Sequence, residues 1–234
     1  MPVVLPVGHF DAGLDGGPRA APVTALLALL CAFVFLGPQD QGRDGAWAQA
    51  LGAVPSSVVG ALGGVPGAEP APGLWPPLTL VTSLAVHASW AHLFYNLVAL
   101  WVFGAAVERV VGGGPALALY VGGGVLASLA EVASSAGSAV PVVGVSGVVA
   151  VAAGAFAVGF PRSRVVVAAL FLTVPVPAWA ALGTWAALEV VVSAGATGGG
   201  VAHVAHLCGF GLGALAALTP PFRPKPDPEA DSSS

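Results

Sequence analysis

Charged residues are scarce in this chain. Only 8% of its 234 residues are Asp, Glu, Lys or Arg, and a single lysine is present. A soluble domain usually carries about 25% charged residues. Because 56% of the sequence is hydrophobic, the chain could not cover itself with a polar surface. The composition therefore excludes a soluble globular protein and predicts an integral membrane protein.

Cysteine is also rare. Cys31 and Cys208 both lie inside apolar runs, so they indicate neither a disulfide framework nor the spacing of a metal site. Residues 1–36 contain one basic residue, Arg19, and no A-x-A cleavage site, so we expect no cleaved signal peptide. Residues 20–36 are instead predicted to be a retained first span.

The motifs of several enzyme classes are missing. The chain has no HExxH sequence, and none of its long apolar segments contains Asp, which excludes the common membrane metalloproteases and the aspartyl intramembrane proteases. The sequence GVSGV does not fit the G-x-S-x-G elbow of soluble hydrolases. No glycine run is followed by Lys-Ser or Lys-Thr, so a phosphate-binding loop is excluded as well.

Long apolar runs are present. Runs of about 17–25 apolar residues are typical of transmembrane helices. Six segments meet this description: 20–36, 84–107, 115–134, 144–160, 177–195 and 200–218. The run 164–174 is too short to cross a bilayer, and we expect it to lie at the interface or to begin the fifth span.

The basic residues support this count. If the N-terminus is cytoplasmic, the outer segments hold only Arg43. The inner segments then hold the other six basic residues, Arg19, Arg109, Arg162, Arg164, Arg223 and Lys225. Such a bias is what the positive-inside rule predicts. We therefore expect an all-α, six-helix, multi-pass protein of a cell membrane, the plasma membrane of a bacterium, with both termini cytoplasmic.

Two short tails flank the predicted membrane domain, 20–218. Residues 1–19 and 219–234 are rich in proline and charge and are predicted to be disordered and cytoplasmic. The outer loop, 37–83, is rich in Gly and Pro but contains Trp47 and Trp75. It is expected either to lie partly in the outer leaflet or to form a flexible connector.

Polar side chains on three spans are predicted to share one depth. The second, fourth and sixth spans all enter from outside, and each carries polar residues near its outer end. These residues are His87, His92, Asn96, Ser146, His203 and His206. A buried polar group costs a few kcal/mol, of order 1–3, unless it is paired, so polar residues inside a span are functional candidates.

This set of residues suits acyl transfer. A serine hydroxyl becomes nucleophilic when a neutral imidazole accepts its proton. The side chains of Asn96 and His92, four residues apart on one helix face, and the backbone N–H of Ser146 could stabilise the oxyanion. Inside a membrane the natural acyl substrate is a peptide bond.

Glycines are spaced to bring the fourth and sixth spans together. Gly209 and Gly213 follow the small-xxx-small pattern, and Gly144, Gly147 and Gly154 form a matching strip. Close packing of these spans would bring a histidine to Ser146.

Other interpretations stay open. A serine between glycines is often only a packing residue. Four histidines could in principle share a metal ion: His87, His92, His203 and His206. No carboxylate in the sequence is placed to join them, so we expect neither a metal nor a cofactor. Glu131 and Glu189 would suggest an ion path, although isolated acids near helix ends often only bond to neighbouring helices.

Three stretches resemble the rhomboid family of intramembrane serine proteases. They are 79–114 (TLVTSLAVHASWAHLFYNLVALWVFGAAVERVVGGG), GVSG at 144–147 and AHLCGFGLG at 205–213. The resemblance implies a six-helix core, a Ser–His dyad without an acidic third member, and cleavage of transmembrane segments near the outer face. The partners it implies are transmembrane protein substrates and the lipid bilayer, with no nucleic acid and no metal.

The matching motifs imply a role for each residue. Ser146 matches the nucleophile of the G-x-S-G motif and His206 the base of the A-H-x-x-G motif. His92 and Asn96 match the H-x-x-x-N oxyanion pair, and His87 the outer histidine that precedes it. Glu108 and Arg109 match the pair that ends the second helix. The glycines expected to support the site are Gly144, Gly147, Gly209 and Gly213.

The sequence departs from the family pattern twice. Many members carry a Trp-Arg pair in the outer loop, where this chain has Trp75 followed by Pro76, and some carry an aromatic residue at the position of Ala150. The expected function is an intramembrane serine endopeptidase. The alternative is a non-catalytic rhomboid-like protein that binds membrane clients, a class that has typically lost the serine or the histidine.

Overall fold

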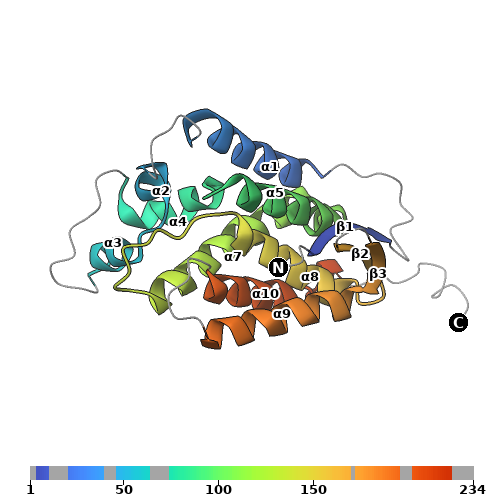
Figure 1. Ribbon diagram of the computed structural model, residues 1–234. Coiled ribbons are helices and arrows are strands. Elements are labelled where there is room, and N and C mark those ends of the chain that lie inside the picture. Colours follow the sequence, from blue (N-terminus) through green and yellow to red (C-terminus); the bar gives the residue numbers. More distant parts are fainter. Residues whose placement is uncertain are drawn as a thin grey trace, which may run out of the picture.

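Figure 1 shows the protein as a computed structural model whose long helices run back and forth along one direction. The structure describes residues 4–10, 21–39, 46–63, 74–169, 172–195 and 202–222. Parts of the two predicted tails, 1–3, 11–19 and 223–234, lie outside these residues, as do Arg19, Arg43, Arg223 and Lys225.

Each segment predicted as a span contains a helix. The helices are α1 (Pro22–Val34), α5 (Trp90–Ala99), α7 (Gly113–Ser134), α8 (Ser146–Gly159), α9 (Ala178–Gly195) and α10 (His203–Ala216). A π-helical turn, Phe35–Gln39, extends α1, and another, Leu100–Gly104, joins α5 to α6 (Ala105–Val111). Within the described ranges, Trp90–Val111 and Gly113–Ser134 are long and apolar enough to cross a membrane, and five other apolar helices are shorter.

The long loop before α5 packs against one end of the helices, which we call the loop end. It contains α2 (Ala46–Leu51), α3 (Pro55–Ala61) and α4 (Thr79–Thr82). Ala53 and Val142 exchange two backbone hydrogen bonds of 3.0 and 2.9 Å. Val58 and Leu80 pack with Val132 of α7 in a small apolar cluster. The described part of the loop is therefore folded rather than a flexible connector.

A small antiparallel sheet covers the opposite end, which we call the sheet end (Figure 1). Its strands are β1 (Val4–Phe10), β2 (Arg164–Ala169) and β3 (Leu172–Pro177), in that order. The structure thus differs from the prediction of a disordered tail at Val4–Phe10 and of an all-α fold. The β-branched run RVVV favours a strand, and Pro175 and Pro177 disfavour a helix. Pro6 lies in an edge strand, where a missing N–H is tolerated.

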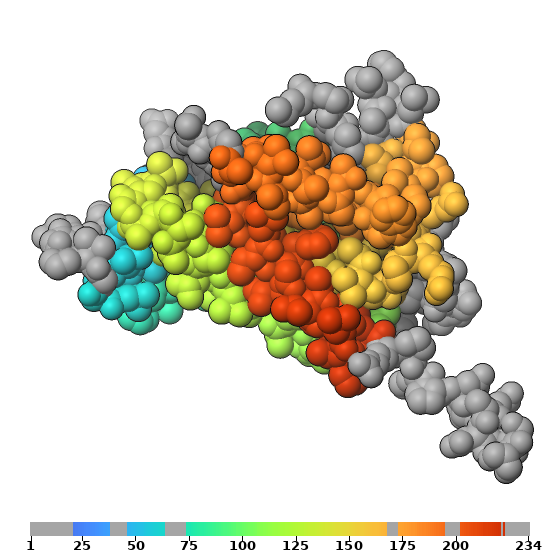
Figure 2. All heavy atoms as spheres, turned by 90° about the horizontal axis from the view of Figure 1, so that it is seen from below, coloured from blue at the N-terminus to red at the C-terminus, as the bar shows by residue number. Residues whose placement is uncertain are grey.

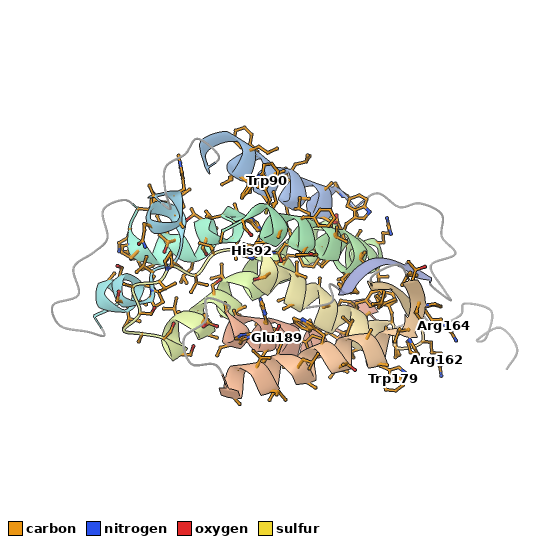
Figure 3. The ribbon with its side chains drawn as sticks, in the orientation of Figure 1. Trp90, His92, Arg162, Arg164, Trp179 and Glu189 are labelled. Atoms are coloured by element: carbon orange, nitrogen blue, oxygen red, sulfur yellow. The ribbon has the colours of Figure 1, made fainter. Side chains whose placement is uncertain are left out.

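Basic residues of the described ranges gather at the sheet end. Arg109 lies in the last turn of α6, and Figure 3 shows Arg162 and Arg164, the first residue of β2, at this end. Trp179, at the same end, is 65% exposed. Exposed tryptophan and clustered basic residues are typical of the ends of membrane-spanning helices.

Glu108 connects the second helical segment to α1 at the sheet end. Its carboxylate accepts the N–H of Val23 at 2.8 Å and both the N–H and the hydroxyl of Thr24 at 2.7 Å. The first N–H groups of a helix have no partner inside the helix, and its N-terminus favours a negative charge. Buried Glu108 therefore caps α1 from a neighbouring helix.

Small residues fill the interior, whereas large apolar residues cover the outside of the helices. In α8 almost every residue from Gly147 to Phe156 is buried. Exposed large residues include Leu26, Leu29, Phe33, Phe94, Trp101, Leu126, Leu188, Val191 and Leu215. Figure 2 shows one face of the molecule, on which α10 lies between α9 and α7. An apolar exterior with small residues between the helices fits a lipid environment.

Candidate active site

Ser146 begins α8 at the loop end, directly after a backbone conformation that suits glycine. Gly144 has φ +113°, and a Cβ there would lie 2.8 Å from Cε1 and Nε2 of His92 and 3.7 Å from Oγ of Ser146. A side chain at position 144 would therefore be strained and would collide with the imidazole. The glycine lets His92 approach the segment that carries Ser146.

His87 holds this segment in place. The ring is fully buried, with Nδ1 3.2 Å from the carbonyl of Ala85 and Nε2 3.5 Å from the N–H of Val145. These contacts fit a neutral ring that donates from Nδ1 and accepts at Nε2. The N–H of Gly144 also donates to the carbonyl of Ser83 at 2.9 Å. The residues just before Ser146 are thus tied to the segment that precedes α5.

His92 presents an N–H donor towards Gly144. Its backbone N–H donates to Oγ of Ser89, which caps α5, and its Nδ1 accepts the N–H of Ala88 at 3.4 Å. A neutral imidazole that accepts at Nδ1 carries its proton on Nε2, the atom beside Gly144. Figure 3 shows Trp90 near α1 and His92 on the other side of α5.

Asn96 follows His92 by one helical turn, on the same face of α5. The residue is 7% exposed, and its Nδ2 is buried without a hydrogen-bond partner. A buried amide donor without a partner is uncommon in folded proteins and requires an explanation. A substrate oxyanion would be a suitable acceptor.

Asn96→Ala is expected to lower the rate at which Ser146 reacts with a fluorophosphonate by about 10²–10³, the usual cost of removing one oxyanion donor. The second-order labelling rate measures this effect. Gln49→Ala, which removes an exposed amide of α2 at the same end, is the control and should react like wild type. Equal rates for Asn96→Ala and wild type would show that the Asn96 amide does not stabilise the oxyanion.

Glycines allow α8 and α10 to pack closely. A Cβ on Gly209 would lie 2.6 Å from the carbonyl oxygen of Gly147 and 3.1 Å from Cβ of Ala150, and one on Gly213 would overlap the carbonyl of Val151. A Cβ on Gly147 itself would lie 3.2 Å from Cβ of Ala127 in α7. The first turn of α8 therefore contacts the second turn of α10, and the two helices pack closely as the small-residue pattern predicts.

This packing places Ser146 and His206 on neighbouring turns. Ser146 precedes Gly147, and His206 precedes Gly209 by one turn of α10. His92 and His206 belong to α5 and α10, which both pack against α8. Within the described ranges no hydrogen bond joins the Ser146 hydroxyl to His206. Catalytic hydrogen bonds are often long without substrate and tighten when it binds.

Two side chains of α9 contact His206; Trp185 had no role in the sequence-based prediction, and Glu189 had been considered only for an ion path. The Trp185 ring lies 5.9 Å from the His206 ring, at an angle of 41°. Oε2 of Glu189 lies 3.2 Å from Nδ1 of His206 and accepts a hydrogen bond of 2.6 Å from Nδ1 of His203. The expectation that no carboxylate joins the histidines is therefore wrong. Trp185 also supplies the aromatic contact that Ala150 cannot provide.

Glu131 fixes the start of α10. Its Oε2 accepts the backbone N–H of Ala205, in the first turn of α10, at 3.0 Å. This bond satisfies one of the N–H groups that a helix leaves unpaired at its N-terminus. A carboxylate from α7 thus holds the residue before His206, which gives Glu131 a structural role in place of the ion path considered from sequence.

Two buried side-chain atoms in the described ranges have no hydrogen-bond partner, Nδ2 of Asn96 and Nδ1 of His206. Both belong to residues that the sequence analysis placed in the site. The 3.2 Å approach of Glu189 to Nδ1 lacks the alignment of a hydrogen bond. Buried polar groups without partners, on two helices that both pack against α8, indicate a functional site rather than a packing core.

The fold and this site define a helical membrane protein with a serine, histidines and an amide gathered at one end. Residues 74–220 match the Rhomboid domain family. Because this match covers more than half of the chain, the protein belongs to the rhomboid family, whose members are membrane proteins.

The chain is also similar to Rhomboid protease GluP of Bacillus subtilis (strain 168), with 42% identity over 52 residues. The aligned stretch covers 22% of this chain and 10% of that protein. The chain thus matches only about a tenth of the relative's length.

Proposed function

We propose that this protein is an intramembrane serine endopeptidase that cleaves transmembrane segments of membrane proteins near the outer face of the bilayer. The observation that carries the proposal is that the two unpaired buried atoms, Asn96 Nδ2 and His206 Nδ1, belong to α5 and α10, which both pack against α8, the helix that begins with Ser146. Family membership and the similarity to a rhomboid protease support it.

The proposed topology has six spans with both termini in the cytoplasm of the cell. Arg109, Arg162 and Arg164 at the sheet end support a cytoplasmic orientation of that end. The loop end, where α5, α8 and α10 begin, then faces outside. Short helices such as α8 can lie in a locally thinned bilayer at modest cost.

In the proposed reaction Ser146 attacks the scissile carbonyl carbon while Nε2 of His206 accepts the hydroxyl proton. A small movement of Glu189, whose Oε2 lies 3.2 Å from Nδ1 of His206 but is not aligned with it, would let the carboxylate accept the Nδ1–H and keep Nε2 free to act as the base. The N–H groups of His92 Nε2, Asn96 Nδ2 and the Ser146 backbone then stabilise the oxyanion.

The tetrahedral intermediate collapses when His206 delivers its proton to the leaving amine. The peptide C–N bond breaks, and Ser146 retains the acyl group as an ester. Water then enters from the loop end, loses a proton to His206, and attacks the ester, which returns Ser146 to its hydroxyl form. The reaction consumes one water and requires no cofactor.

A substrate helix must unwind before it is cut, because its carbonyl groups are hydrogen-bonded within the helix. We therefore expect substrates with Gly or Pro near the scissile bond. Entry past α9 is supported by the large apolar residues on the outer side of that helix, such as Leu188 and Val191. Trp185 and Glu189, on the inner side, contact α10 residues.

The test is labelling of the detergent-solubilised protein with a fluorescent fluorophosphonate, comparing wild type with Ser146→Ala. Label on wild type alone would support an activated serine at this position. Label on both proteins would mean that a different serine reacts. If neither is labelled while a reference serine protease reacts in the same tube, the non-catalytic client-binding function gains support and the protease proposal fails.

A further inference from the structure

Three side chains of the kinds that bind metals meet where α9 faces α10. Oε2 of Glu189 lies 2.6 Å from Nδ1 of His203 and 3.2 Å from Nδ1 of His206. One ligand atom from each residue lies within 4.8 Å of the other two. The exposed fractions of the side chains are only 13–15%, so the cluster is shielded but still reachable. Figure 3 shows Glu189 on α9, far from the arginines of the sheet end.

The spacing of these atoms suits a tetrahedral zinc site. Zn²⁺ binds imidazole nitrogen and carboxylate oxygen at about 2.0–2.2 Å, which places neighbouring ligand atoms roughly 3.4 Å apart. The two observed separations, 2.6 and 3.2 Å, are shorter than that value, and all three ligand atoms lie within 4.8 Å of one another, so a small outward movement of the side chains would admit the ion. Two imidazoles and one carboxylate form a known zinc set with one open position. Mg²⁺ and Ca²⁺ prefer sites made of oxygen alone.

We propose that Glu189, His203 and His206 bind a zinc-class transition-metal ion and that the bound ion switches the protease off. The switch rests on the proposed function, because His206 is the proposed base. A neutral imidazole has one lone pair and one N–H. When the metal occupies the lone pair on Nδ1, the N–H is on Nε2, which then has no lone pair to accept the Ser146 proton. Removing the ion restores the base without breaking any covalent bond.

Binding is tested with Zn²⁺ alone, titrated by calorimetry into the full-length Ser146→Ala protein in detergent. One ion is expected per chain. His203→Gln should raise the dissociation constant at least about tenfold, because losing even an outer-shell partner costs about 10–100-fold. Glu189→Gln, which keeps the side-chain shape, should weaken binding similarly. His9→Gln, in β1 at the opposite end, is the matched control and should bind like its parent.

Cobalt gives a second readout of the same site. Co²⁺ bound in place of Zn²⁺ should show visible absorption bands of a four-coordinate site, and these should be lost in His203→Gln. The metal site would be overturned if Ser146→Ala did not bind zinc. It would also be overturned if Ser146→Ala and Ser146→Ala/His203→Gln bound zinc equally well.

The switch is tested by fluorophosphonate labelling of the protein with Ser146 intact. Saturating Zn²⁺ should slow labelling at least about tenfold, since a general base contributes about 10²–10⁴ to such a rate, and EDTA should restore it. The labelling rate of His203→Gln should be the same with and without zinc. Zinc binding without slower labelling would overturn the switch. A protein that is never labelled would contradict the proposed function, while calorimetry on Ser146→Ala would still decide the metal site.

Discussion

Replacing His206 with glutamine is expected to slow both fluorophosphonate labelling and cleavage of a transmembrane substrate by about 10³-fold or more. Glutamine is polar and similar in length, but its amide cannot accept a proton at neutral pH. Ser146 would then keep its proton and remain a weak nucleophile. The oxyanion donors on α5 would be unaffected, so the loss would report the base alone.

The double variant Ser146→Ala/His206→Gln distinguishes a dyad from two independent contributions. When two residues act as one unit, removing either one already removes the catalytic effect of both. The double variant should therefore cleave no more slowly than either single variant. His9→Gln, the same exchange at the sheet end, should retain the wild-type rate. If His206→Gln kept a rate within tenfold of wild type, or if the two losses added, the dyad would be contradicted.

The depth of the candidate site along the helices could be predicted, because it depends only on the lengths and directions of the apolar segments. Successive membrane helices alternate in direction, so residues at the starts of the second, fourth and sixth must share one end. In the structure α5, α8 and α10 all have their N-terminal ends towards the loop end (Figure 1). His92, Ser146 and His206 lie within the first turns of these helices.

The contribution of α9 could not be predicted in the same way. This helix is apolar on almost every side, so no hydrophobic face indicates which side meets α10. Trp185 and Glu189 are four residues apart and therefore share a face, but only packing shows that this face meets His206. The missed feature was thus the rotation of one helix about its axis, which also decides whether a carboxylate joins the histidines.

The sheet was missed for a related reason. Val4–Phe10 pairs with Arg164–Ala169, a segment far away in sequence. Strand formation depends on such a partner more than on intrinsic preference, so a short segment with Pro6 and Gly8 gives no strand signal by itself. The strand exists because the hairpin after α8 offers it a free edge.

Gly209→Ala is expected to reduce labelling of Ser146 by about 10²-fold or more and to destabilise the fold by about 1–3 kcal/mol. The new methyl group would lie 2.6 Å from the backbone oxygen of Gly147. Backbone cannot rotate away as a flexible side chain can, so α8 and α10 must move apart. A shift of about 1 Å between base and nucleophile is enough for a loss of this size.

Gly211→Ala provides the matched control, because a Cβ at that position of the same helix meets nothing within 4 Å. Both changes add one methyl group and favour the helix equally, by up to about 1 kcal/mol. Gly211→Ala should therefore label like wild type and unfold at the same or a higher temperature. If both variants behaved alike, the contact between Gly209 and Gly147 would not set the position of His206. A loss confined to Gly209→Ala would show that close helix packing, which the sequence encodes through small residues, brings the base to the serine.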